Sequence, residues 1–390
     1  MIEKQMTINL GPQHPSTHGV LRVKCQLDGE TVVTAEPIIG YLHTGFEKTG
    51  EQHTYLQAVT LPDRMDYLSP GTSNLAYVLA VERLLQLQMP PRVDYIRVLW
   101  AELSRLASHL VWLGTHVMDL GAMSLFFYTF RERELILDLM EMVAGVRMNP
   151  TYLRVGGLAF DLPEGFHSQT KAFLDEFPEW LREYNNMLKN NPILDARLRG
   201  VAPLSQEEAL AYSVTGPTLR ATGLALDLRR AAPYCRYDEF DFEIPVATEG
   251  DAYARFWLRV LEMTEIWKIL RQVLEKITPV GEHKVVDHKI SLPPRHEIYG
   301  NMEAMIRQFK LVTEGFRVPK GEAYAAVESP KGEMAFFIVS DGGHKPYRFR
   351  ARTPSFYNLQ SLPVMAKDAL IADVVTAIGS LDIVLGDVDR

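Results

Sequence analysis

The sequence predicts an α+β protein with a predominantly helical core, built as an antiparallel helix bundle, a small N-terminal β-sheet and a C-terminal β-hairpin region. Three observations favour this fold class. Hydrophobic residues alternate with polar ones between residues 21 and 27, recur every three or four positions between 96 and 113, and alternate again between 347 and 352. A chain of 390 residues is long enough for one large domain or two intimately packed ones.

The N-terminal sheet is predicted from a strand pattern followed by a turn signal. Between Leu21 and Leu27, apolar side chains alternate with charged or amide side chains, as in a strand with one buried face. Asp28-Gly29 then predicts a tight turn into a second strand that begins at Thr31. We therefore assign residues 1–65 to an N-terminal β-rich region.

A long helix is predicted next because the hydrophobic spacing changes to three and four. Its apolar face consists of Ile96, Leu99, Leu103, Leu106, Leu110 and Leu113. A capping box, Ser205-x-x-Glu208, predicts the start of a shorter helix. Long helices with short connections usually pack antiparallel, so residues 66–320 are predicted to form the helical core. Further helices are expected at about 72–88, 131–144, 169–189 and 251–277.

The charged run Arg131-Glu132-Arg133-Glu134 stands at the expected start of one of these helices. In a solvated first turn its ion pairs would each contribute roughly a few tenths of a kcal/mol. In an assembly of several subunits the run would instead be buried at a junction. Both interpretations stay open on the sequence.

The C-terminal residues 321–390 are predicted to form a β region with a tail packed on the core. Strand-like segments lie at 323–328, 334–340 and 347–352, separated by turn signals. In the last segment, Tyr347, Phe349 and Ala351 are expected on a buried face, with arginines between them on a charged face.

Composition argues against several classes of protein. The formal net charge is −8 and no basic stripe with interleaved aromatics is present, which disfavours nucleic acid as a partner. Cys25 and Cys235 form no CxxC pair, so the chain alone is not expected to hold an iron–sulfur cluster or a cysteine zinc site. Because no secretory signal and no run of ~18 apolar residues is present, a soluble or peripheral protein is expected.

Two short runs contain the side chains best suited to chemistry, GPQHPSTHGV at residues 11–20 and RMDYL at residues 64–68. Together they supply groups that can hydrogen-bond to and protonate a carbonyl-type acceptor. Pro15 disfavours the helical region for His14, so His14 and His18 are expected on a loop. The same proline disfavours the alternative of a helical HxxxH metal site, and no local carboxylate or cysteine completes a ligand set.

These two runs also carry a family resemblance that extends from about residue 7 to the last residue. The sequence resembles the large hydrophilic quinone-site subunit of respiratory complex I, the D-type subunit of bacteria and the 49 kDa subunit of mitochondria. The resemblance also rests on five further runs: IGYLHTGFEK at 39–48, ELSRLASHL at 102–110, FRERE at 130–134, IVSDGG at 338–343 and GDVDR at 386–390.

The resemblance implies that His18 and Tyr67 bind and protonate the quinone headgroup, and that Asp119 is the carboxylate partner of His18. Ordinary pKa values of about 10 for tyrosine and 6.5 for histidine let both side chains hold a proton at neutral pH. A carboxylate beside His18 would favour its imidazolium form. The alternative for all three residues is an ordinary structural role in the core, at the surface or at a helix cap.

The resemblance further implies that electrons come from a [4Fe–4S] cluster in an adjacent subunit, and that Arg64 lies near this cluster. A cation there would raise the reduction potential by stabilising the reduced state. The alternative for Arg64 is a structural salt bridge. Many relatives carry a histidine after Arg147-Met148 that couples the cluster potential to pH, whereas this chain has Asn149, which does not titrate.

A deeper resemblance is to the large subunits of nickel–iron hydrogenases, which implies a hydrogenase-large-subunit-like fold. Asp66 and Ser69, and Val384 and Asp387, stand where those proteins have their two CxxC pairs. Because soft metals need soft ligands, a nickel–iron centre is excluded, and no metal or flavin is expected on this chain. A cavity in the former metal position is expected to receive the quinone headgroup.

The implied function is that of a quinone-site subunit of a proton-translocating NADH:quinone oxidoreductase, active only within the complex. The expected partners are four other subunits of complex I: the cluster-bearing B-type, the C-type, the I-type and the membrane-embedded H-type. The expected location is peripheral, on the cytoplasmic face of the bacterial cell membrane. Two alternatives are a non-catalytic scaffold subunit and the equivalent subunit of a ferredoxin-fed relative of the complex.

Overall fold

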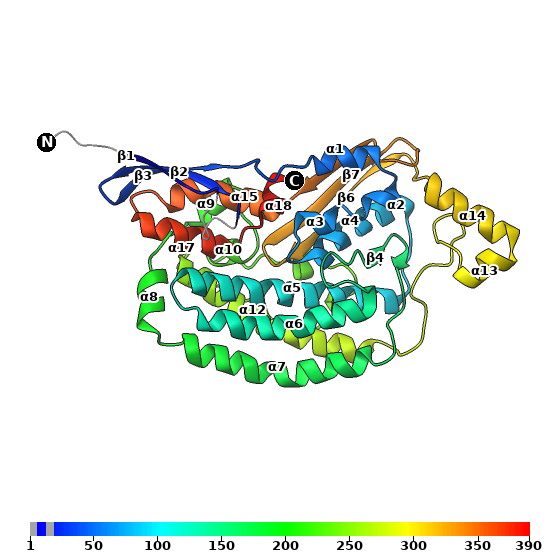
Figure 1. The fold of residues 1–390 in the computed structure, drawn as a ribbon, viewed down its shortest axis with the longest axis horizontal. Helices are drawn as coiled ribbons and strands as arrows, with labels where there is room; N and C mark the ends of the chain where they lie inside the picture. Colours follow the sequence, from blue (N-terminus) through cyan, green and yellow to red (C-terminus); the bar gives the residue numbers. More distant parts are fainter. Residues whose placement is uncertain (1–5, 13–18) are drawn as a thin grey trace.

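The computed structural model describes residues 6–12 and 19–390, and it confirms the α+β class. Figure 1 shows a layer of long helices below and a layer of sheets with shorter helices above, while α13 and α14 project at one end. The elements not treated below are α1 Phe46–Gln52, α2 Tyr55–Ala58, β4 Leu153–Arg154, β5 Gly157–Leu158, α8 Pro192–Leu198, α9 Gln206–Ala211, α11 Leu228–Ala231, η2 Tyr237–Glu239, α13 Arg295–Gly300 and α14 Met302–Thr313.

The N-terminal sheet contains β1 Met6–Leu10, β2 Arg22–Asp28 and β3 Thr31–Ile38, all antiparallel and in this order. The alternation predicted from the sequence is confirmed, because the apolar side chains of β2 are buried. The sheet packs on C-terminal helices, and backbone hydrogen bonds from Val32 N to Ala369 O and from Ile371 N to Glu30 O join the two ends of the chain.

The bundle contains α4 Pro70–Leu85, α5 Pro91–Asp119, α6 Ser124–Ala144, α7 Phe166–Leu188 and α12 Ala252–Lys276. The predicted apolar face of α5 is confirmed, since all six of its residues are buried. α5 packs against α4, α6 and α12, which makes it the central helix of the protein. The predicted capping box is also confirmed, with Ser205 and Glu208 each bonding to the other's backbone N–H.

The C-terminal sheet contains β6 Gly321–Ser329, β7 Gly332–Ser340 and β8 Arg348–Arg352, in antiparallel order. α4 lies against β6 and β7 and covers the buried Phe336 and Phe349. The predicted burial of Tyr347 is wrong: its side chain is 71% exposed, because the strand begins one residue later. Four helices follow, α15 Pro354–Gln360, α16 Leu362–Met365, α17 Ile371–Leu381 and α18 Leu385–Asp389.

The predicted position of the charged run 131–134 at a helix start is also wrong. α6 begins at Ser124, seven residues before Arg131, because its buried face already starts at Leu125. The run therefore lies in the middle of the helix. Glu132 is fully buried and pairs with Arg131, while Arg147 beyond the helix pairs with Glu134.

The buried residues form two large hydrophobic clusters. One joins the bundle to the C-terminal sheet, and the other joins the N-terminal sheet to α15, α16 and α17. The two ends of the chain therefore share one core. The division of the chain at residues 65 and 320 stays a prediction.

A network of buried charges crosses the interface between these layers. Glu262 of α12 accepts hydrogen bonds from Arg220 at 2.5 Å and from Arg105 at 3.4 Å, and its other close neighbour is His109, at 3.1 Å. Arg220, in α10 Pro217–Arg220, also pairs with Glu328 of β6 at 2.7 Å. Although burial opposes ionisation, the charge of Arg220, a hydrogen bond from His109 and the charge of Arg105 hold the pKa of Glu262 well below its usual range.

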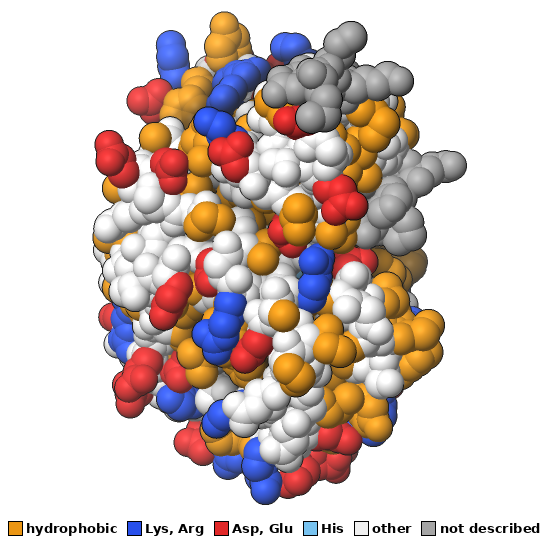
Figure 2. Space-filling view, turned by 90° about the vertical axis from the view of Figure 1, so that its left-hand side faces the viewer, with side chains coloured by type: hydrophobic (Ala, Val, Ile, Leu, Met, Phe, Trp, Pro, Cys, Tyr) orange, Lys and Arg blue, Asp and Glu red, His pale blue; other side chains and the backbone are white. Residues whose placement is uncertain are grey.

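The outer face at the end occupied by β1–β3 and α8 carries both signs of charge. Figure 2 shows Lys and Arg interspersed with Asp and Glu there, with hydrophobic side chains between them. None of the described helices combines the length and apolar character needed to span a bilayer.

Replacing the buried carboxylate at the centre of the network is expected to destabilise the protein strongly. Glu262→Gln leaves Arg220 and Arg105 without their shared counter-charge, which costs about 3–5 kcal/mol for a broken buried pair. Glu275→Gln, at an exposed position of the same helix, is the matched control and should change stability by about 0.5 kcal/mol or less. Urea unfolding of the purified chain measures both, and equal losses would contradict the central role of Glu262.

Candidate functional site

The segment Arg64-Met65-Asp66-Tyr67 lies at the junction of α3 Pro62–Met65 and α4. Asp66 ends α3, because its side chain accepts hydrogen bonds from the backbone N–H groups of Leu68 and Ser69, both at 3.2 Å, in place of a further helical turn. Pro70 then starts α4 at a position where no N–H is needed. Tyr67 is therefore presented from a tight turn between two helices.

Tyr67 lies half-buried against the last helix of the chain. Gly386 of α18 approaches so closely that a Cβ there would lie 3.2 Å from Cε1 of the Tyr67 ring and 2.7 Å from the Met65 carbonyl oxygen. Burial, followed by the negative charge of Asp66, raises the pKa of Tyr67; Asp387 adds to this, and a hydrogen bond from the Leu385 backbone opposes it. The phenol therefore holds its proton at neutral pH.

Asp66 pairs with a buried lysine that the sequence did not single out. Lys331 lies in the turn between β6 and β7, and its Nζ is 3.2 Å from Asp66 Oδ2 and 2.6 Å from Ser108 Oγ of α5. All three side chains are buried. A lysine in a Pro-Lys-Gly turn is normally solvent-exposed, so no sequence signal could have placed it in the interior.

Asp387 is the second buried carboxyl beside Tyr67. Its Oδ2 accepts a hydrogen bond of 2.9 Å from the backbone N–H of Ser355, at the start of α15, while its Oδ1 has no hydrogen-bond partner among the described residues. Burial and the charge of Asp66 raise the pKa of Asp387 to about 7, against the opposing effects of Ser355 and Lys331. Asp387 is therefore the group beside Tyr67 that gains and loses a proton near neutral pH.

The four residues that the hydrogenase resemblance aligns with metal ligands are all buried, and α3 and α18 pack directly against each other there. They are Asp66, Ser69, Val384 and Asp387. No group of three or more potential metal-ligating side chains occurs within residues 6–12 and 19–390. The predicted cavity at this place stays a prediction, although a pocket of about 280 Å³ lies beside α18, between Glu47, Arg348 and Asp389.

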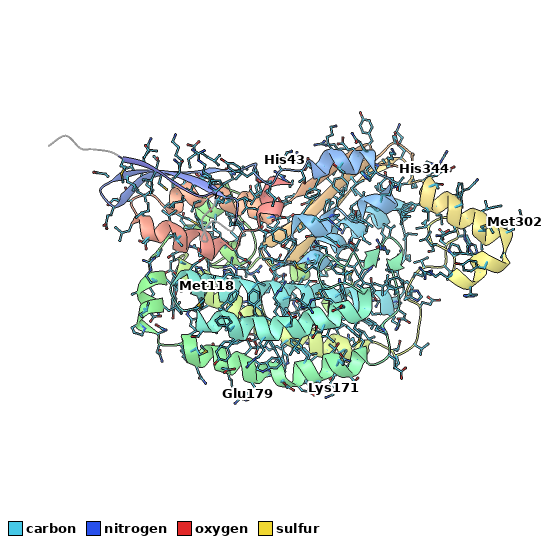
Figure 3. The ribbon with its side chains drawn as sticks, viewed as in Figure 1. His43, Met118, Lys171, Glu179, Met302 and His344 are labelled. Carbon is cyan, nitrogen blue, oxygen red and sulfur yellow. The ribbon has the colours of Figure 1, made fainter. Side chains whose placement is uncertain are left out.

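Two motifs far apart in the sequence meet beside this pocket. Asp389 accepts hydrogen bonds from the backbone N–H groups of Gly40 at 2.8 Å and Leu42 at 2.7 Å. The Nδ1 atom of His43 lies 2.7 Å from the Asp389 carbonyl oxygen, and Figure 3 shows His43 beside the C-terminal helix. These contacts join run 39–48 to run 386–390.

Arg64 is exposed on α3, where its Nη1 donates a 2.7 Å hydrogen bond to Thr60 O. It forms no salt bridge with a described residue, and both interpretations of Arg64 stay predictions. Its neighbour Asp63 is buried and accepts two hydrogen bonds of 2.6 Å from Thr151. Since Asn149 is two residues from Thr151, the same contact holds the Asn149 loop against α3.

Asp119 is the remaining predicted site residue that the structure describes, and it lies away from Tyr67. Asp119 is the last residue of α5 and half-buried; Figure 3 shows its neighbour Met118 at the same end of the helix. Asp119 is eleven residues beyond Ser108, which corresponds to roughly 16 Å along the helix axis. His18, like His14, lies outside the described residues. The structure therefore brings Tyr67, Asp66 and Asp387 together, and Asp119 stands apart from them.

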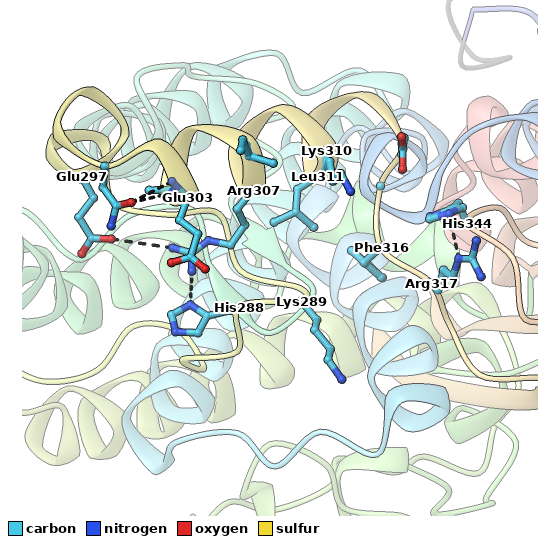
Figure 4. Close-up of a pocket in the computed structure, with 15 residues that line it drawn as sticks. His288, Lys289, Glu297, Glu303, Arg307, Lys310, Leu311, Phe316, Arg317 and His344 are labelled. Atoms are coloured by element: carbon cyan, nitrogen blue, oxygen red, sulfur yellow. Dashed lines mark hydrogen bonds and ion pairs between the residues drawn. The ribbon is translucent and has the colours of Figure 1, made fainter.

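A further pocket, away from Tyr67, is a separate feature. It has a volume of about 750 Å³ and lies between α14, the segment at 288–289 and the segment at 315–317. Figure 4 shows Arg307 between His288 and Glu297, with Arg317 bonded to His344 at the other end. None of the residues grouped around Tyr67 lines it.

Comparisons with known proteins agree on one family. Residues 119–390 match the family described as "Respiratory-chain NADH dehydrogenase, 49 Kd subunit". The chain is 55% identical over 390 residues to a D-type subunit of the NADH-quinone oxidoreductase of Roseiflexus sp. (strain RS-1), covering 100% of this chain and 94% of the relative. It is 49% identical over 385 residues to the D-type subunit of the NADH-quinone oxidoreductase of Geobacter sulfurreducens, covering 99% and 98%.

The close approach of Gly386 to the Tyr67 turn predicts a specific sensitivity. Gly386→Ala places a methyl group against the carbonyl oxygens of Arg64 and Met65, and overpacking of this kind costs about 1–3 kcal/mol. Gly300→Ala is the control, because its Cβ would meet nothing within 4 Å. Urea unfolding compares the two variants, and a neutral Gly386→Ala would show that the contact is not tight in solution.

Proposed function

Because this chain belongs to the family of the 49 kDa subunit of respiratory-chain NADH dehydrogenase, and is thus a subunit of an oxidoreductase complex, we propose that it forms most of the quinone headgroup site. The observation that carries the proposal is Tyr67, a protonated phenol held between two helices beside two buried carboxyl groups. A proton donor fixed in this way can hydrogen-bond to a quinone carbonyl oxygen and protonate it as the quinone is reduced.

Reduction of a quinone to a quinol takes up two electrons and two protons. In the proposal, Tyr67 donates one proton to one carbonyl oxygen, and His18, held by Asp119, donates the other. A [4Fe–4S] cluster of the adjacent subunit would supply the electrons. Arg64, exposed and without a salt bridge to a described residue, is available to face that subunit.

The proposed partners are the cluster-bearing B-type, the C-type, the I-type and the membrane-embedded H-type subunits. The chain would be peripheral, on the cytoplasmic face of the bacterial membrane. Quinone chemistry would be coupled to proton translocation by the charge changes at Tyr67, His18 and Asp119. NADH oxidation would take place elsewhere in the complex.

Two other functions are kept as alternatives. A non-catalytic scaffold subunit would need no protonated side chain at the Tyr67 turn. The equivalent subunit of a ferredoxin-fed complex would use the same quinone site with another electron donor, and the presence or absence of an encoded NADH-oxidising module distinguishes it. The buried carboxyl groups around Tyr67 favour a site over a scaffold.

Removing the phenolic hydroxyl tests the proposal. Tyr67→Phe should lower quinone reductase activity of the membrane-bound complex by about 10²-fold or more, because general acid catalysis is lost. The electron paramagnetic resonance signal of the partner cluster verifies assembly. Tyr152→Phe, which removes another buried tyrosine hydroxyl, bonded to Phe160 O, is the matched control. Full activity of assembled Tyr67→Phe would instead support the scaffold alternative.

Asn149 predicts how the cluster potential depends on pH. Since asparagine does not titrate and its loop is held against α3 through Thr151 and Asp63, the potential should change little with pH. Asn149→His should introduce a pH-dependent slope. Potentiometric titrations of both complexes at several pH values measure this, and a full proton-coupled slope in the unaltered complex would refute the prediction.

A further inference from the structure

Asp387 is a buried carboxyl group that the proposed mechanism does not yet use. Its side chain is fully buried, and among the described residues only Ser355 hydrogen-bonds to it, whereas an ionised carboxylate in the protein interior usually accepts bonds from several groups. The Oδ1 atom of Asp387, which has no hydrogen-bond partner among the described residues, can carry the proton of a neutral carboxyl group. This environment therefore favours the protonated form of Asp387 in the resting protein.

The surrounding charges lead to the same conclusion. Four groups face Asp387 from the elements packed against it: Asp66 and Tyr67 from the turn between α3 and α4, Lys331 from the turn between β6 and β7, and Ser355 from α15. Lys331, the single cation among them, is already paired with Asp66 at 3.2 Å.

A third carboxyl group nearby has its own partner. Asp382 lies 3.9 Å from the guanidinium Nε of Arg259. Burial raises the pKa of Asp382 to about 6, although Lys331 and Arg259 oppose this. Asp387 is thus the carboxyl group of the cluster whose charge is least compensated.

Asp387 and Tyr67 are linked through the first turn of α18. Gly386 contacts the Tyr67 ring, the Leu385 backbone bonds to the Tyr67 hydroxyl, and the next side chain is Asp387. We propose that Asp387 stores a proton for the quinone site and returns it to Tyr67 after each turnover. This inference rests on the proposed role of Tyr67. Because Asp387 acts through Tyr67 and does not touch the quinone, it is a positioning residue for the donor.

The steps balance in protons and electrons. With the two electrons that the partner subunit's cluster would supply, two O–H bonds form on the quinone. The proton of one comes from Tyr67, whose own O–H bond breaks, and the proton of the other comes from His18, as in the proposed function. The resulting tyrosinate takes the proton of Asp387, which becomes a carboxylate beside Lys331 and Ser355 N. Asp387 then regains a proton from solvent. Transfer to Tyr67 is downhill, because the raised pKa of the phenol exceeds that of the carboxyl group.

The test is the pH profile of quinone reductase activity in the assembled complex. If protonated Asp387 is required, activity should fall by up to tenfold per pH unit above about 7, where the carboxyl group ionises. We call this fall the alkaline limb of the pH profile. Asp387→Asn, which keeps the shape and the Ser355 bond, should reduce the rate at pH 6 at least tenfold and remove this limb. A wild-type rate that is constant from pH 6 to 9, or an assembled Asp387→Asn variant that keeps the limb, would overturn the proposal.

Two further variants separate the possible causes. Asp66→Asn removes a negative charge and frees Lys331 to pair with Asp387, so the limb should move to lower pH. A limb that does not move counts against the proposal even where Asp387→Asn does not assemble.

Asp382→Asn, which changes another buried carboxyl group, is the matched control and should keep the limb. Loss of the limb in this variant would also refute the proposal. Normal activity of Tyr67→Phe would refute the proposed function itself, whereas an inactive Tyr67→Phe with an unchanged Asp387→Asn refutes this inference alone.

Discussion

Glu262 is the residue on which the arrangement of the layers depends. Its carboxylate lies inside the protein with Arg220, Arg105 and His109 around it, and the four residues come from three different helices. A buried charge without partners is expensive, so the structure is stable only when α5, α10 and α12 are in register with one another. Because removing these charges from water costs free energy, the network adds little net stability. For the same reason, an arrangement that separates the charges from their partners is strongly disfavoured.

The same constraint reaches the candidate site. Glu328 links Arg220 to β6, and the turn that follows β6 carries Lys331 into the interior, where it pairs with Asp66 beside Tyr67. The position of the tyrosine therefore depends on the sheet, the bundle and the last helix together. Since Lys331 is paired with Asp66, Asp387 has no cation of its own among the described residues. The proposed protonation of Asp387 therefore follows from the pairing of Lys331 with Asp66.

Local patterns predicted much of this fold. The alternation in β2, the apolar face of α5 and the capping box at Ser205 are set by interactions within a few residues, and all three are confirmed. Predictions at element boundaries were less accurate, as for the charged run 131–134 inside α6. There the periodic signal is weak, because apolar and polar residues both occur on the face that tertiary packing buries.

The sequence by itself determined the family, the helix and strand types and the candidate chemistry of Tyr67, because these depend on short motifs and on hydrophobic period. Tertiary structure alone decided that Lys331 is buried, that Asp66 and Asp387 face the same tyrosine, and that run 39–48 is bonded to the C-terminus. The reason is physical: a buried charge is tolerated only where its partners converge, and those partners are separated by up to several hundred residues of chain.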